Sequence, residues 1–205
     1  MAECFPIILS APSGAGKTTV ANELLKGKKI ARVITATTRA PRLGEKHGRD
    51  YFFWSVSDFE KAIKNKQMLE WAKVHVNYYG IPKSSLESVL KMGKCPLLVI
   101  DVQGAKTVKK LYKNAVMIFL TAPSIATLKK RIAARSDGTK DVAVRLKTAL
   151  KELKQIKNYD YLVINDNLKE CVTTCRAIIE AESKKVVRQK DLVKKLNKSG
   201  EKNGK

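Results

Sequence analysis

The sequence predicts an α/β fold in which a mostly parallel sheet carries helices on both faces. Short β-branched and aliphatic runs alternate along the chain with longer segments of helical periodicity. Each of these runs is continuously apolar, which is typical of strands buried on both faces of a parallel sheet. A glycine-rich segment from Ser10 to Thr18 lies where the first strand gives way to the first helix, and phosphate-binding loops occupy that position.

Strands and helices are expected to alternate as repeated βα units, which is the pattern of a parallel sheet. The strands are expected over residues 6–10, 31–35, 95–101, 115–120 and 161–165. The helices are expected over residues 17–25, 105–111, 124–135 and 141–158, and from residue 168 onward. Ser124, which follows Pro123, is a candidate N-cap for the third of these helices.

Residues 36–92 have a different texture and predict an inserted α+β subdomain. Four consecutive aromatic residues occupy 51–54, and the pattern Ser57-x-x-Glu60 indicates a capping box at the start of a short helix. Residues 68–76 alternate in hydrophobicity like an antiparallel strand. The core would then comprise residues 1–35 and 93–183.

Two further segments depart from the regular pattern. The run Ser136 to Asp141 breaks two basic helices and indicates a short lid over about residues 135–145. Apolar residues become sparse after about Val187, so we expect residues 184–205 to form a basic, partly disordered tail.

Size and composition exclude several classes of protein. A chain of 205 residues buries a sizeable core without disulfide or metal staples. With 44% hydrophobic and 29% charged residues the chain is neither disordered nor fibrous, and no apolar run reaches the length of a membrane span. The four cysteines form no Cys-x-x-Cys pair, and two histidines make no metal-ligand cluster. We expect a protein of the reducing cytoplasm, without an export signal or a membrane partner.

The charge balance favours an anionic partner. Lys and Arg number 41 against 19 Asp and Glu, a net charge of +22, and the excess extends well beyond the basic tail. Nucleic acid, phosphates and a membrane surface would all satisfy it. A nucleic-acid partner rests on this charge alone and is not favoured; such binding would weaken steeply with added salt.

The glycine-rich segment carries the first chemical signal. Its glycines let backbone N–H groups turn onto phosphate oxygens, Lys17 neutralises charge on the β- and γ-phosphates, and the Thr18 hydroxyl is a ligand for Mg²⁺. The nucleotide-binding residues are then Ser13, Gly14, Ala15, Gly16, Lys17, Thr18 and Thr19. Ala11 stands where the full pattern opens with glycine. A glycine-rich turn with a surface lysine is the alternative, and the strand and helix on either side disfavour it.

Asp101 ends a strand and would lie at the carboxyl edge of the sheet, beside the phosphate loop. A carboxylate there suits the water shell of Mg²⁺ or a bound nucleotide. A strand-terminal acid also often caps the next helix, and the sequence leaves both readings open.

Arg39 and Arg42 flank Pro41, which stiffens their separation. Two guanidinium groups so placed suit the gripping of one phosphate group, to which Tyr51 and Tyr79 would add hydroxyl donors.

At these residues the sequence resembles the guanylate kinase family. The shared motifs are the phosphate loop, Thr-Thr-Arg-x-Pro-Arg-x-Gly-Glu-x-x-Gly-x-Asp-Tyr at 37–51, Glu70-Trp71, Asn77-Tyr78-Tyr79-Gly80 and Ile100-Asp101-x-Gln103-Gly104. They follow in the family's order over residues 5 to about 183. The resemblance implies a P-loop fold like that of nucleoside monophosphate kinases. It also implies transfer of the γ-phosphoryl group of ATP to GMP, or to dGMP, with Mg²⁺ as cofactor.

The resemblance also implies roles for individual residues. Arg39, Arg42, Tyr51 and Tyr79 would hold the GMP phosphate, Glu45 would support the arginines, and Thr35, Glu70 and Asp101 would face the guanine. Arg131, Arg135 and Arg145 would close over the ATP phosphates, and Asn165 would contact the adenine. Glu70 makes independent sense, because guanine offers adjacent N1–H and N2–H₂ donors to a carboxylate and adenine does not.

Two positions depart from the family pattern. Ile81 stands where the family usually has a Ser or Thr that reaches the guanine carbonyl, so that contact is lost or supplied by Ser84 or Ser85. Val99 stands where a second acid is frequent. We expect this chain to make fewer contacts with the base than is usual in the family.

Alternatives remain for the lid and for the whole chain. Arg131 and Arg135 are four residues apart, as on any solvated basic helix face. Guanylate-kinase-like domains also serve as catalytically silent protein-binding modules, although an intact phosphate loop argues for the enzyme. The sequence leaves the oligomeric state open between monomer and homodimer.

Overall fold

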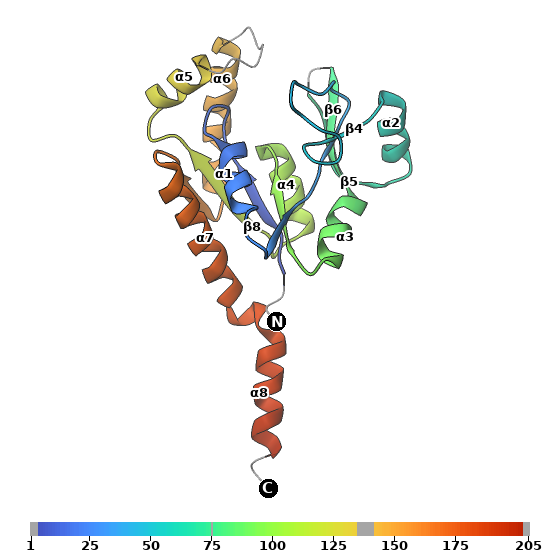
Figure 1. Ribbon diagram of the computed structural model, residues 1–205, viewed down its shortest axis with the longest axis vertical. Coiled ribbons are helices and arrows are strands. Elements are labelled where there is room, and N and C mark those ends of the chain that lie inside the picture. Colours follow the sequence, from blue (N-terminus) through green and yellow to red (C-terminus); the bar gives the residue numbers. More distant parts are fainter. Residues whose placement is uncertain (1–3, 75, 135–141, 203–205) are drawn as a thin grey trace.

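The computed structural model describes residues 4–74, 76–134 and 142–202, and it places two sheets side by side (Figure 1). The larger sheet has the strand order β2-β7-β1-β8-β9, and all of its pairs are parallel. Its strands are β1 (Ile7–Ser10), β2 (Ile30–Arg32), β7 (Cys95–Val99), β8 (Val116–Thr121) and β9 (Tyr161–Ile164). The predicted α/β class with a mostly parallel sheet is confirmed.

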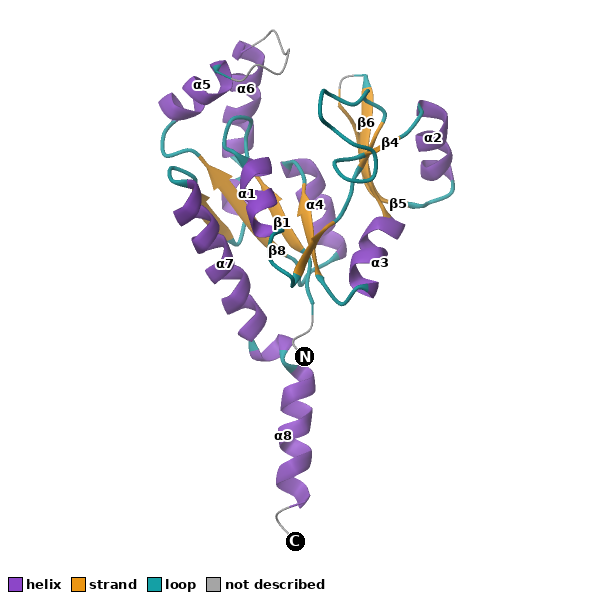
Figure 2. Ribbon diagram, viewed as in Figure 1, coloured by secondary structure: helices purple, strands orange, loops and turns teal. Residues whose placement is uncertain are grey.

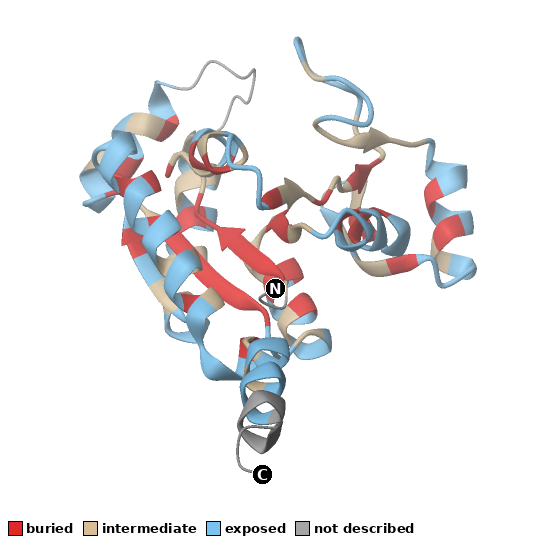
Figure 3. Ribbon diagram, turned by 60° about the horizontal axis from the view of Figure 1, so that its bottom comes forward, coloured by how far each residue is buried: buried red, intermediate tan, exposed pale blue. Residues whose placement is uncertain are grey.

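Helices cover both faces of this sheet (Figure 2). Ile7 and Leu9 of β1 face one core cluster, to which α1 (Lys17–Leu24) and α7 (Leu168–Lys184) contribute. Ile8 points the other way, into a second cluster built on α3 (Lys83–Lys91) and α4 (Val102–Leu111). Because β1 is central and buried along its whole length, its carboxyl end is a rigid base for the loop that follows (Figure 3).

The edge strand β9 departs from the expectation of burial on both faces. Val163 packs into the core, whereas Leu162 and Ile164 are 51% and 53% exposed. The expectation is wrong here because β9 pairs only with β8, and the side of β9 that carries Leu162 and Ile164 joins no core cluster.

The second sheet has the order β4-β3-β6-β5 and lies within residues 36–82. Its strands are β3 (Ala36–Thr37), β4 (Phe52–Phe53), β5 (Met68–Val74) and β6 (Asn77–Pro82). β5 and β6 pair antiparallel, as the alternation in the sequence predicts. The single strand expected over 31–35 is wrong: β2 ends at Arg32 and β3 begins at Ala36, because the chain crosses there from one sheet to the other.

The helix of the second sheet, α2 (Val56–Lys64), has its N-cap two residues earlier than predicted. Its N-cap is Ser55, whose hydroxyl accepts a hydrogen bond from the Asp58 backbone N–H at 3.0 Å. Ser57 lies inside the first turn, so the predicted Ser57-x-x-Glu60 capping box is wrong. The cap and Asp58 in the first turn both suit the positive end of the helix.

Two described α-helices lie between β8 and β9. Ser124 caps α5 (Ile125–Ala133) by accepting from the Thr127 N–H at 3.0 Å, which confirms the predicted cap. α6 (Val142–Leu153) follows, and a short 3₁₀ helix (Ile156–Asn158) leads into β9. The predicted break at 136–141, with Arg135, lies outside the described residues.

The C-terminal segment is more ordered than the sequence suggests. A 3₁₀ helix (Val186–Arg188) leads into α8 (Lys190–Lys202), which extends away from the sheet (Figure 1). Arg188 is buried, pairs with Glu182 at 3.0 Å and lies 3.9 Å from the ring centroid of Phe5. The predicted tail therefore contains a packed anchor and a helix. Of the helices described here, none combines the length and the apolar character needed to cross a membrane.

Candidate functional site

Two cavities open at the carboxyl edge of the parallel sheet. One, of about 740 Å³, is lined by the phosphate loop and by residues of α5 and α6. The other, of about 230 Å³, lies against the second sheet and the start of α4. Lys17 lines both cavities, so its ammonium group stands where they meet.

The phosphate loop has the backbone that its glycines permit. Gly14 and Gly16 have φ values of 84° and 83°, a left-handed conformation that residues with a Cβ rarely adopt. Gly16 is also the N-cap of α1, and a Cβ there would lie only 2.4 Å from Asn165 Nδ2. The glycines thus let the loop turn into the positive end of α1, where backbone N–H groups are free to bind an anion.

Lys17 is held between the two cavities by polar groups. Its ammonium donates to the Ile100 carbonyl at 3.0 Å. Burial lowers the pKa of Lys17, while the nearby carboxylates of Asp101 and Glu152 act in the opposite direction and favour the charged form.

Two of the three predicted lid arginines reach the phosphate-loop cavity. Arg145 of α6 donates from Nη2 to Ser13 Oγ at 2.8 Å, and Arg131 of α5 donates from Nη1 to the Asn165 carbonyl at 2.7 Å. Both line the cavity. Arg135 lies outside the described residues. Arg131 is therefore more than a member of a solvated helix face.

Asn165 and Ala15 of the phosphate loop do not line the cavity. Asn165 is buried, and its side-chain Nδ2 donates to the Ala15 carbonyl at 2.8 Å. In this structure the amide braces the loop, so the predicted contact between Asn165 and adenine would need a different side-chain orientation. Ser13, Gly14, Gly16, Lys17, Thr18 and Thr19 do line the cavity.

The second cavity brings together five of the residues assigned to GMP. Its lining includes Thr35, Tyr51, Glu70, Tyr79 and Asp101. Burial, and then the charge of Asp101, raises the pKa of Glu70 to about 7. The carboxylate is therefore poised to gain from neighbouring hydrogen-bond donors.

Asp101 serves as a helix cap and also lines the cavity. Its Oδ1 accepts from the backbone N–H groups of Gln103 at 2.9 Å and Gly104 at 2.8 Å, at the start of α4. The helix-cap reading is confirmed, and the role of Asp101 toward a nucleotide or Mg²⁺ stays a prediction. The cap explains why α4 begins at Val102 rather than at the predicted Ala105.

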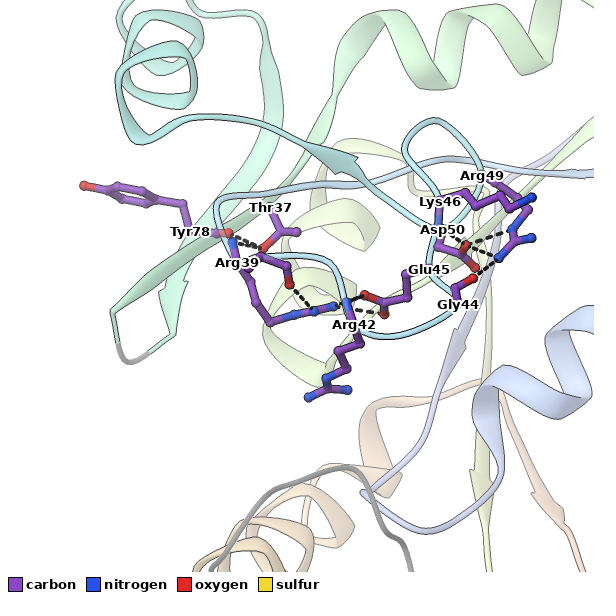
Figure 4. Close-up of polar contacts among 10 residues, drawn as sticks. Thr37, Arg39, Arg42, Gly44, Glu45, Lys46, Arg49, Asp50 and Tyr78 are labelled. Atoms are coloured by element: carbon purple, nitrogen blue, oxygen red, sulfur yellow. Dashed lines mark hydrogen bonds and ion pairs between the residues drawn. The ribbon is translucent and has the colours of Figure 1, made fainter.

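The loop after β3 presents the two arginines differently (Figure 4). Arg39 Nη2 pairs with both carboxylate oxygens of Glu45 at 3.0 Å, and Arg42 donates only its backbone N–H to Glu45, at 2.7 Å. The Arg42 guanidinium turns away from Glu45 and has no ion pair within the described chain. Glu45 thus fixes Arg39 and the turn of the loop, and leaves the Arg42 side chain available to an anion.

Tyr51 and Tyr79 stand beside these arginines. Their rings meet edge to face at 6.4 Å, and the Arg39 guanidinium lies 5.5 Å from the Tyr51 ring centroid. Both tyrosines line the second cavity, whereas neither arginine does, and Arg39 reaches the cavity edge through its contact with Tyr51.

The departures at 81 and 99 have different outcomes. Ile81 is fully buried in the core cluster of α3 and α4, so no group at this position reaches the second cavity. Ser85 is buried in α3 and Ser84 is exposed, and neither lines the cavity to replace the missing hydroxyl. Val99 does line the second cavity, and it gives an apolar surface at the position where the family frequently has an acid.

The burial of Ile81 predicts the effect of restoring a hydroxyl there. Ile81→Ser should lower the free energy of unfolding by about 2–5 kcal/mol, because it leaves a cavity and an unpaired hydroxyl in the core. Ile81→Val, the control, should cost only about 0.5–1.5 kcal/mol. Chemical denaturation measures both, and we expect no gain in GMP affinity from the serine. A serine variant of wild-type stability with a lower KM for GMP would show that position 81 faces the base.

Two residues of the site escaped the sequence analysis. Glu152 of α6 lines the larger cavity, and nothing local marks it among the charged residues of that helix. Gly104 faces Glu70: a Cβ at Gly104 would lie 3.4 Å from both oxygens of the Glu70 carboxylate. Its place in the 100–104 motif was the one available signal.

Comparisons with known proteins agree with this geometry. A family model described as guanylate kinase matches residues 4–182. Guanylate kinase of Clostridium tetani is 43% identical over 188 residues, 91% of this chain and 90% of the relative, and that of Thermotoga maritima is 40% identical over 191 residues, 92% of each chain. The crystal structure of guanylate kinase from Anaplasma phagocytophilum is similar with a TM-score of 0.77 and 34% identity, covering 92% of this chain and 90% of that one.

Proposed function

Since this chain belongs to the guanylate kinase family, we propose that it transfers the γ-phosphoryl group of ATP to GMP and forms ADP and GDP. One observation carries the proposal: Lys17 lines both the phosphate-loop cavity and the cavity of Glu70. A donor phosphate bound by the loop and an acceptor phosphate beside the tyrosines would meet at this ammonium group.

We assign ATP to the larger cavity. Backbone N–H groups of residues 14–18 and Lys17 would bind the β- and γ-phosphates, and Arg131 and Arg145 would neutralise the charge that moves with the transferred group. Arg145 would exchange its bond to Ser13 for the phosphates. Arg135 and the lid over 135–145 belong to the same proposal.

We assign GMP to the smaller cavity and to residues 36–92 as its subdomain. Arg39, Arg42, Tyr51 and Tyr79 would hold the phosphate, and Glu45 would fix Arg39. Glu70 would accept from guanine N1–H and N2–H₂, with Thr35 and Asp101 beside the base. The core of residues 1–35 and 93–183 would carry the ATP site and would close the GMP site with Thr35 and Asp101.

A divalent metal fits the oxygen donors of this site, and we assign Mg²⁺. The Thr18 hydroxyl lines the larger cavity and Asp101 the smaller, and such hard oxygens suit Mg²⁺. No three Asp, Glu, His or Cys side chains gather as a metal cage in the described chain, so phosphates and waters would complete the coordination. When bound, Mg²⁺ neutralises charge on the β- and γ-phosphates.

The main task of the protein in this reaction is to align the two phosphate groups. An oxygen of the GMP phosphate bonds to the γ-phosphorus as the bond from that phosphorus to the β-bridging oxygen breaks, and the electron pair leaves on ADP. The attacking phosphate oxygen is already ionised near neutral pH, because the second pKa of such a phosphate is about 6, so no side-chain base is needed. Alignment, charge neutralisation and exclusion of water supply the catalysis.

The four free cysteines favour a reducing compartment, the cytoplasm.

A substrate panel tests the proposed function. ADP production would be coupled to an optical signal with Mg-ATP and, in turn, GMP, dGMP, AMP, CMP and UMP. We expect GMP to give by far the highest kcat/KM. Equal turnover with AMP, or no turnover with any nucleotide, would contradict the assignment.

The pH dependence of GMP binding tests Glu70 separately. The carboxylate must be charged to accept from guanine, and its pKa of about 7 lies above the ordinary value because of burial and Asp101. The KM for GMP should therefore rise as the pH falls, by roughly tenfold between pH 8 and pH 6, because protonation removes the charge and turns one of the two accepting oxygens into a donor. Glu70→Gln, which keeps only the titration of GMP itself, is the control. A wild-type profile that parallels the glutamine variant would contradict the charged role.

A further inference from the structure

Glu152 lies in the last turn of α6, half-buried, and lines the phosphate-loop cavity. Ser13 and Lys17 line the same cavity. Burial raises the pKa of Glu152, while the Lys17 ammonium and the Ser13 backbone N–H favour its charged form. A carboxylate that only faced the cavity would repel the triphosphate of a donor nucleotide. Its contacts with Ser13 and Lys17 give it a different use.

One face of α6 holds the phosphate loop at two points. Arg145 and Glu152 are seven residues apart, two helical turns, and therefore lie on the same face, with Thr148 between them. Arg145 binds the Ser13 hydroxyl at 2.8 Å, and Glu152 approaches the N–H of the same residue. A single helix thus bonds to the Ser13 side chain through Arg145 and brings the Glu152 carboxylate into the same cavity.

Lys17 lies between two carboxylates that belong to different cavities. Asp101 lines the acceptor cavity and Glu152 the donor cavity, and Lys17 lines both. The ammonium is anchored to the Ile100 carbonyl at 3.0 Å on the Asp101 side. Asp101 and Glu152 thus both attract the ammonium, one from each cavity.

We propose that Glu152 is a positioning residue for phosphoryl transfer, which holds the Lys17 ammonium and the Ser13 end of the phosphate loop in place for the donor nucleotide. The inference rests on the proposed function. Glu152 acts through Lys17 and the loop, and contact with either nucleotide is not required of it.

Three substitutions separate the charge from the hydrogen bond. Glu152→Gln keeps an acceptor for the Ser13 N–H and removes the charge; Glu152→Ala removes both; Glu152→Asp keeps the charge on a shorter side chain. Glu180→Gln is the matched control, because Glu180 is an exposed acid of α7 that lines neither cavity. Melting curves for all four identify any loss of folding.

Steady-state kinetics give the first readout. We expect Glu152→Gln to lower kcat about tenfold, with the KM for GMP unchanged within about twofold and the melting temperature equal to that of Glu180→Gln. Glu152→Ala should lose more, and Glu152→Asp should recover part of the loss. A kcat loss below about fivefold, or a parallel loss of GMP affinity, would overturn the proposal.

Binding of a non-hydrolysable ATP analogue with Mg²⁺, measured by calorimetry, gives a readout that needs no turnover. Glu152→Gln should weaken this binding about fivefold in the wild-type background and by less than about twofold beside Lys17→Met, because the effect passes through the ammonium. Equal weakening in both backgrounds would overturn the proposal. If the wild-type protein proved inactive with GMP, the proposed function would fail, while this binding cycle would still decide the role of Glu152.

Discussion

Lys17→Met is expected to lower kcat for GMP-dependent ADP formation by ~10³-fold or more, while the protein stays folded and still binds GMP. Lys17 lines both cavities, and under the proposed function its ammonium is the positive charge between donor and acceptor phosphates. No other group in the described site is placed to replace it, because Arg131 and Arg145 approach from the donor side alone.

Methionine is chosen because the ammonium is buried. Burial lowers the pKa of Lys17, so an apolar side chain of similar volume should be tolerated and the melting temperature should not fall. Lys106→Met, on the exposed face of α4, is the matched control. Kinetics give kcat, and calorimetry gives the dissociation constant for GMP, which should change only a few-fold because Lys17 borders that cavity. Near wild-type turnover by Lys17→Met would contradict the assigned role of the phosphate loop in the reaction.

Glu70→Gln is expected to lower kcat/KM for GMP by roughly 30-fold to 1000-fold. The amide has one accepting and one donating end, so it cannot serve the adjacent N1–H and N2–H₂ donors of guanine and leaves one of them unpaired. Loss of a charge-assisted hydrogen bond together with a stranded donor costs about 2–4 kcal/mol. The size of the side chain is preserved, and its neighbour Gly104 is unaffected.

AMP should respond in the opposite direction. The amide can donate to adenine N1, which the carboxylate repels, so the ratio of GMP to AMP turnover should fall far more than stability does. Glu60→Gln is the matched control: it lies in the same subdomain, contacts Tyr78 at 3.1 Å and lines neither cavity. Kinetics with both nucleotides and a melting curve decide the outcome. An unchanged GMP to AMP ratio would exclude Glu70 from base recognition.

Local signals made much of this site predictable. The glycines of the phosphate loop are required by the left-handed backbone of one short turn, so the residues themselves indicate the structure. Asp101 was placed at the sheet edge by its position at the end of an apolar strand, and the structure confirms that it caps α4 and lines the smaller cavity. The roles of Arg39 and Glu70 came from the family resemblance and remain proposals, for which the structure supplies a Glu45 pairing and a shared cavity.

The expectations that went wrong depended on contacts between distant segments. The strand over 31–35 was read as one element because apolar periodicity does not show where a chain leaves one sheet for another. The expected loss of a contact from position 81 to the base stays a prediction, and the sequence did not show that the Ile81 side chain belongs to the core of α3 and α4. The tail was expected to be partly disordered, and the sequence did not show the anchor of Arg188 on Glu182 and Phe5, because that anchor joins distant parts of the chain.

The sequence by itself determined the α/β class, the phosphate loop and the family, because each of these is written in periodicity or in motifs of adjacent residues. Only the tertiary structure decided that Lys17 borders two cavities and that Glu152 faces it across 135 positions of the chain. The physical reason is that charge and hydrogen-bond partners act over a few ångströms of space. Which side chains share that space is set by how α6 and the strands pack, and no local pattern in the sequence records it.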